Sequence, residues 1–76
     1  MEARKTEIKS KVCNNLTKFF AETFPEEEVK SITYRTNDET HEEFADVEFE
    51  NGYIRPVCVT ADSPLAIVCD VIRSMF

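Results

Sequence analysis

The chain has 76 residues, of which 42% are apolar and 32% charged, and its net charge is −6. A chain of this length forms one domain, residues 1–76, and buries roughly 60% of its unfolded surface, while its apolar content excludes intrinsic disorder. The acidic balance argues against direct nucleic-acid binding, which depends on neutralising phosphates. No apolar run approaches the roughly 20 residues of a membrane span, so we expect no membrane partner.

The first residues and the cysteines both indicate a reducing compartment. The segment MEARKTEIKSK lacks the apolar stretch of a signal peptide, which favours a cytoplasmic protein. Cys13, Cys58 and Cys69 are an odd number and contain no CxxC pair, whereas small secreted domains usually carry an even set. We therefore expect three free, buried thiols.

The first predicted element is an amphipathic helix. Its apolar residues recur at helical spacing and are Ile8, Val12, Leu16, Phe19 and Phe20. This period predicts one buried stripe along the helix. Pro25 disfavours helical conformation at the residue before it, so the helix should end near Glu22 or Thr23.

Three strands should follow the helix. Val29–Thr36 and Glu43–Glu50 alternate apolar and polar residues. Asn51-Gly52 is typical of a two-residue type I′ turn, because both residues tolerate positive φ. That turn would place Phe49 opposite Ile54 and Ala45 opposite Cys58. The apolar face would then hold Ala45, Val47, Phe49, Ile54 and Cys58, and the other face a Glu48–Arg55 ion pair.

The last part of the chain predicts an edge strand and a second helix. In the expected register, the missing N–H of Pro56 points away from the second strand, which is tolerated only at a sheet edge. Ser63 as N-cap and Pro64 as first residue predict where the helix begins. Its expected inward stripe is Leu65, Val68, Cys69, Ile72, Met75 and Phe76.

Together these elements predict an α+β domain with the order α-β-β-β-α. The sheet should be a three-stranded antiparallel meander in the order 1-2-3. Both helices should pack on its apolar face, which gives two layers.

No residue pattern predicts catalysis, a metal or a cofactor. His41 is the single histidine and stands beside Glu42 and Glu43 in a predicted turn, without the ligand set that a metal site requires. A Cys–His pair is not expected, because the cysteines should point into the core. A chain this small also leaves little room for a pocket. We therefore expect no enzyme and no cofactor.

We expect instead a protein-interaction module that associates with itself. With both helices on one face, apolar side chains remain outside the core, and such a patch usually marks an interface. Alternatively, the first helix covers the last one and hides Ile67 and Val71. The expected interface residues are Phe44, Tyr53, Val57, Val59, Ile67, Val71 and Phe76.

An alternative function rests on the acidic residues of the second strand. Alternate residues of a strand lie about 7 Å apart on one face, which is close to the phosphate spacing of one nucleic-acid strand. Such a row would imitate a nucleic acid and inhibit a host nucleic-acid-binding defence protein, although a charged face also simply keeps a protein soluble. The residues concerned are Glu42, Glu43, Asp46, Glu48 and Glu50.

Two resemblances accompany these patterns. The order α-β-β-β-α resembles that of double-stranded-RNA-binding domains, but where that family places lysines this chain has residues 61–66, ADSPLA, so the resemblance implies the fold and not the RNA binding. The stretches Asn51-Gly52-Tyr53 and 57–67 are similar to the ends of small proteins encoded in bacterial prophages and mobile elements. That similarity implies a phage-related, cytoplasmic protein.

Overall fold

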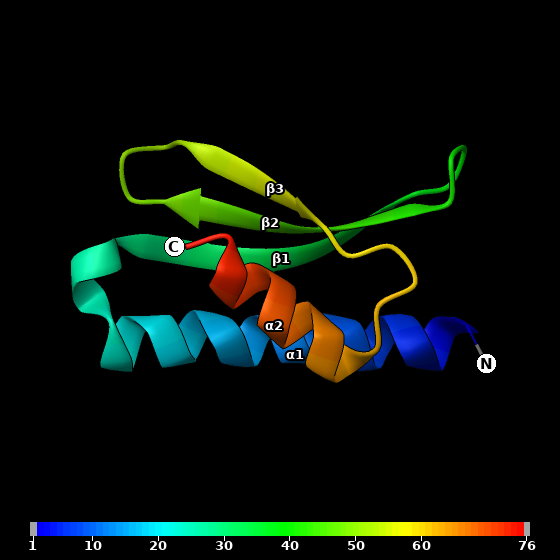
Figure 1. The fold of residues 1–76 in the computed structure, drawn as a ribbon, viewed down its shortest axis with the longest axis horizontal. Helices are drawn as coiled ribbons and strands as arrows, with labels where there is room; N and C mark the ends of the chain where they lie inside the picture. The colour runs from blue at the N-terminus through cyan, green and yellow to red at the C-terminus, as the bar shows by residue number, and fades with distance from the viewer. Residues whose placement is uncertain (1, 76) are drawn as a thin grey trace.

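The computed structural model describes residues 2–75, with side chains for residues 6–75. Its elements are α1 (Glu2–Thr23), a short 3-10 helix η1 (Pro25–Glu27), β1 (Val29–Asn37), β2 (Glu42–Phe49), β3 (Ile54–Cys58) and α2 (Pro64–Arg73). The strands form one antiparallel sheet in the order β1-β2-β3, and both helices lie on one side of it (Figure 1). The predicted α+β fold, its element order and its strand order are confirmed.

Local sequence sets the end of α1 and the start of α2. α1 ends at Thr23, as predicted from Pro25. The Ser63 side chain caps α2 by accepting a hydrogen bond from the Ala66 N–H at 3.2 Å, and Pro64 is the first helical residue. The 22 residues of α1, at about 1.5 Å each, account for most of the 36 Å length of the molecule.

The β2–β3 hairpin differs from the predicted one by a single residue. The Gly52 N–H donates to the Phe49 carbonyl at 2.9 Å, and the Phe49 N–H donates to the Tyr53 carbonyl at 2.8 Å, so three residues form the loop. Gly52 takes a positive φ of 91°, whereas Asn51 does not. A three-residue loop that closes on a glycine bulge has this geometry. The predicted two-residue type I′ turn is therefore wrong.

The extra loop residue exchanges the two faces of β3, because the side chains of a strand alternate with a period of two. Val57, and not Cys58, lies opposite Ala45. Val57 and Val59 are consequently buried. Ile54 and Cys58, which were predicted to face the core, are exposed.

Arg55 changes sides with the rest of β3. It lies opposite Val47 on the helix-facing side, where its guanidinium donates to the Ser74 carbonyl at 2.5 Å. Glu48 projects from the other side and pairs with Lys30 at 3.8 Å. The predicted Glu48–Arg55 ion pair is therefore wrong.

α2 is rotated about its axis relative to the prediction. Ile67 and Val71, expected outside the inward stripe, are completely buried, whereas Leu65 and Cys69, expected inside it, are exposed. The helix is apolar on nearly every side, so its sequence period does not decide which side meets the core. The flanking residues that pack partly against the core are Val68, Ile72 and Met75.

The core fills the space between the sheet and the helices. Its buried members are Cys13, Leu16, Phe20, Val29, Ile32, Ala45, Val47, Val57, Val59, Ile67 and Val71.

Both edges of the sheet are partly blocked. On β1, the Ile32 N–H donates to the Thr17 hydroxyl of α1 at 2.8 Å. On β3, Pro56 lies opposite Asp46, a non-hydrogen-bonded pair because such pairs alternate from the bonded Phe49–Tyr53 pair. Its missing N–H thus falls on the outer edge, as predicted, and discourages another strand from pairing there.

Candidate functional site

The predicted interface residues do not form one surface. Val57, Val59, Ile67 and Val71 belong to the core, so their predicted exposure is wrong. The hairpin register turns the first two inward, and the rotation of α2 turns the other two inward. Phe76 lies outside the described residues.

Phe44 and Tyr53 are accessible but belong to different sides of the sheet. Phe44 is half-buried on the side without helices, where the Arg35 guanidinium lies 4.5 Å from its ring centre. Tyr53 is 55% exposed, and its ring stacks on Phe49 of the helix-facing side with centres 6.0 Å apart. The two residues therefore do not share a patch.

The acidic residues predicted to imitate phosphates are largely paired or separated. Asp46 accepts two hydrogen bonds from Arg35, at 2.6 and 3.2 Å, and Glu48 pairs with Lys30. The outermost members are far apart, since Glu42 begins β2 and Glu50 lies just beyond its last residue. A continuous row of free negative charge is therefore not formed.

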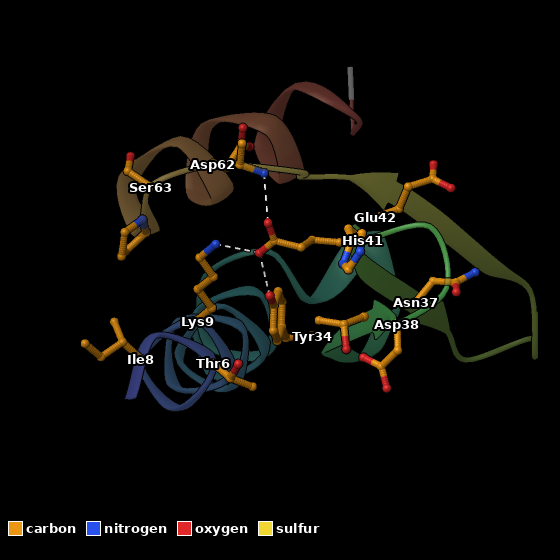
Figure 2. Close-up of a pocket in the computed structure, with 14 residues that line it drawn as sticks. Thr6, Ile8, Lys9, Tyr34, Asn37, Asp38, His41, Glu42, Asp62 and Ser63 are labelled. Carbon is orange, nitrogen blue, oxygen red and sulfur yellow. Dashed lines mark hydrogen bonds and ion pairs between the residues drawn. The ribbon is translucent and has the colours of Figure 1, made fainter. Parts of the chain in front are cut away.

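Glu43, the remaining acidic residue, lines an open hollow of about 750 Å³ near the start of α1. Figure 2 shows this hollow, with Lys9 and Tyr34 among the labelled side chains that line it. The Glu43 carboxylate accepts hydrogen bonds from the Lys9 ammonium and the Tyr34 hydroxyl, both at 2.5 Å, and from the Ala61 N–H at 2.8 Å. α1, β1, β2 and the segment before α2 thus meet at one side chain. The hollow is larger than a chain of this length was expected to offer.

The hydrogen bonds of this network hold several segments of the fold together. Burial opposes ionisation of Glu43, but the hydrogen bonds from Lys9, Tyr34 and the Ala61 N–H outweigh it and lower the pKa of the carboxyl to about 2. Burial and the bond to Glu43 raise the pKa of Tyr34. A carboxylate held this firmly is a poor general base at neutral pH.

A pair of carboxyl groups, those of Asp62 and Asp70, lies near Glu43. The hydrogen bond that a protonated Asp62 makes with Asp70, together with burial and the charge of Asp70, raises the pKa of Asp62 to about 6. The Asp62 Oδ2 atom is buried without a hydrogen-bond donor among the described residues. A proton shared by the two carboxyls supplies that donor at low pH, and its loss leaves two like charges together.

The remaining reactive side chains are dispersed. Burial raises the pKa of Cys13 to about 11, which keeps it as an unreactive thiol, whereas Cys58 and Cys69 are exposed, contrary to prediction. His41 lies exposed in the β1–β2 loop with a φ of 60°. Among the described side chains, no three of His, Cys, Asp or Glu gather in a way that could hold a metal ion.

The other end of the molecule carries an apolar groove of about 370 Å³ between the ends of α1 and α2. Its lining residues are Phe19, Phe20, Phe24, Glu27, Ile72 and Met75. The three phenylalanine rings contact one another with centres 5.6 to 5.9 Å apart. Phe20 is only 4% exposed, but Phe19 and Phe24 are 42% and 40% exposed. We refer to this site as the aromatic groove.

The sequence pattern placed Phe19 and Phe20 in the helix stripe and did not predict a groove. The signal was nevertheless present, because three phenylalanines fall within residues 19–24 just before Pro25. Neighbouring residues of a helix point in different directions, so the sheet and α2 bury Phe20 but leave Phe19 partly exposed.

Comparison of the chain with protein-family models, curated proteins and solved structures finds no match. None of the helices that the structure describes combines the length and the apolarity needed to cross a membrane.

Proposed function

We propose that the protein is a non-enzymatic protein-interaction module and that the aromatic groove is its contact surface. The observation that carries the proposal is the pair of adjacent, two-fifths-exposed rings of Phe19 and Phe24. Phe20, Phe44 and Phe49 are, by contrast, buried or half-buried. Exposed apolar side chains that gather in one place mark interaction sites, and buried aromatic anchors contribute much of the energy of such contacts.

The state of the ionisable groups supports a function without catalysis. The Glu43 carboxylate is already occupied by three donors, and Cys13 is a buried thiol whose raised pKa keeps it protonated. Neither group is poised to attack or deprotonate a substrate.

The groove is preferred to the surfaces expected from the sequence. Four of the expected interface residues lie in the core, and Arg35 and Lys30 neutralise the central acidic residues of β2. The inhibitor that imitates a nucleic acid is therefore not favoured. Self-association, a phage-related origin and a cytoplasmic location remain predictions, and a second copy of the chain is one candidate occupant of the groove.

Affinity capture with matched variants tests the proposal. Tagged wild type, Phe24→Ser and Leu65→Ser would be incubated with an extract of the organism that encodes the chain. Leu65 is the control because it is 73% exposed and lies seven residues, about 10 Å, from Ile72 along α2. We expect a protein that wild type and Leu65→Ser retain and that Phe24→Ser loses by about tenfold, as for an interface anchor. Equal capture by all three proteins would contradict the proposal.

A further inference from the structure

We infer that the aromatic groove takes a basic segment of a partner protein that packs two large aliphatic or aromatic side chains against the exposed rings of Phe19 and Phe24. This inference rests on the proposed function and adds the chemistry of the partner. It is carried by the charge around the groove and by the shape of its apolar lining.

The rim of the groove is acidic. Glu27 lines the groove itself, and Glu22, Glu26 and Glu28 are exposed on the same corner of the chain. None of these four glutamates forms an ion pair with a described side chain. Residues 18–28 contain a single cationic residue, Lys18, so the corner has an excess of negative charge that a partner can neutralise.

The end of α1 adds to this negative potential. A helix carries a partial negative charge at its C-terminus, where its last carbonyls lack intrahelical partners. The last turn of α1 contains no basic residue to offset that charge. A lysine or arginine of a partner is therefore attracted both by the glutamates and by the helix end, whereas an acidic or phosphorylated partner is repelled.

The acidic corner is held in place before a partner arrives. The Glu28 N–H donates to the Pro25 carbonyl at 3.1 Å, and the Glu50 N–H donates to the Glu28 carbonyl at 2.8 Å. Glu28 itself adopts a left-handed φ of 57°, a conformation that persists where neighbouring structure maintains it. These bonds tie η1 to the β2–β3 hairpin and reduce the ordering cost of binding.

The lining of the groove explains why the partner needs an apolar anchor as well as charge. Phe19 and Phe24 form an exposed edge-to-face pair, and Ile72 and Met75 of the α2 end complete the groove. Met75 is adaptable in shape because its side chain is unbranched. Two anchors four residues apart on a basic amphipathic helix match a groove of this kind.

Peptide titration tests the inference directly. The probe is a fluorescein-labelled 12-residue peptide of lysine and alanine with two leucines four positions apart. One control peptide replaces both leucines by serine, and another replaces the lysines by glutamate. Binding of each peptide to the full chain would be followed by fluorescence anisotropy at low and high salt, for wild type, Phe24→Ser, Phe19→Ser, Leu65→Ser and the double variant Glu26→Gln/Glu27→Gln.

The inference predicts a specific pattern of dissociation constants. The basic leucine peptide should bind wild type and Leu65→Ser equally and at least tenfold more tightly than either control peptide. Each phenylalanine variant should weaken it by about tenfold, and the double glutamate variant by a few fold with a smaller salt dependence. A thermal melt of each variant verifies folding. If a phenylalanine variant fails to fold, the peptide pairs on wild type still decide the outcome.

Three results would overturn the inference. The first is equal binding of the basic and acidic leucine peptides to wild type. The second is that Leu65→Ser weakens binding of the basic leucine peptide as much as Phe24→Ser does. The third is self-association in light scattering that Phe24→Ser abolishes, since it would place a second copy in the groove. If the peptides fail while a captured protein still depends on Phe24, the partner chemistry is wrong and the proposed function stands.

Discussion

Glutamate and aromatic side chains have different surroundings at the two ends of the molecule. At the end near the start of α1, Glu43 accepts hydrogen bonds from three donors in three other segments. At the other end, Glu27 has no ion-pair partner among the described side chains, and two phenylalanine rings lie partly in solvent. The difference separates a site that the fold uses for its own stability from one that remains available to a partner.

Under the proposed function, the larger of the two hollows is not the contact surface. The larger hollow, at about 750 Å³, holds a carboxylate whose bonds are already made. The smaller one, at about 370 Å³, exposes apolar rings without cover. A binding partner gains free energy by removing exposed apolar surface from water, and the volume of a hollow does not measure that gain.

The largest effect should come from removing the ring beneath the groove. Phe20→Ala should lower the free energy of unfolding by about 3 kcal/mol, because the ring is 4% exposed and its loss leaves a cavity. Phe19→Ala, at the neighbouring and 42% exposed position, should cost about 1 kcal/mol or less. Urea denaturation measures both. Equal losses would show that Phe19 belongs to the core and not to an available surface.

Breaking the network at the opposite end should have the next largest effect. Glu43→Ala leaves Lys9, whose side chain is 12% exposed, without its anion and also removes the bond to Tyr34. We expect a loss of about 2 kcal/mol in the free energy of unfolding. Glu43→Gln should lose less, since the amide oxygen still accepts a hydrogen bond. A stability unchanged by Glu43→Ala would contradict the view that the hydrogen bonds of this residue stabilise the fold.

The carboxyl pair behind Glu43 should give this end a characteristic pH dependence. Because the pKa of Asp62 is raised from 3.8 to about 6 in the fold, its contribution is present below pH 4 and is lost as the pH rises through 6. Because the pKa of Glu43 is lowered from 4.5 to about 2, its contribution is lost as the pH falls from 4.5 toward 2.

Asp62→Asn should therefore abolish the decline in stability between pH 4 and 7 and raise stability at pH 7 by about 1 kcal/mol, while leaving the acid limb intact. Urea midpoints from pH 2 to 8 measure both limbs. An unchanged decline above pH 4 in the variant would exclude a shared proton between Asp62 and Asp70.

The smallest effect is expected for the acidic residue at the groove. Glu27→Gln should change the free energy of unfolding by less than about 0.5 kcal/mol, as for an exposed side chain that forms no ion pair with a described residue. Comparing this variant with Glu43→Gln in the same denaturation experiment shows how the surroundings of a glutamate change its contribution to the free energy of unfolding. A loss comparable to that of Glu43→Gln would mean that the acidic rim is structural.

Several features of the protein follow from the sequence alone. The end of α1 and the start of α2 depend on residues adjacent in the chain, namely Pro25 for α1 and Ser63-Pro64 for α2. The order of the strands and the position of Pro56 at an edge follow from alternation and from a missing N–H. Such features are local, because each depends on backbone groups within a few residues of one another.

The side chains that define the surface were decided by tertiary structure. One residue more in the hairpin loop buries Val57 and exposes Cys58, and Asn-Gly is compatible with both loop lengths. The rotation of α2 likewise depends on packing against α1 and the sheet, since the helix is apolar on nearly all sides. The aromatic groove exists because the ends of two helices distant in sequence meet there. Register, rotation and helix meeting points are settled by which side chains fill the common core, and periodicity within one element does not encode that choice.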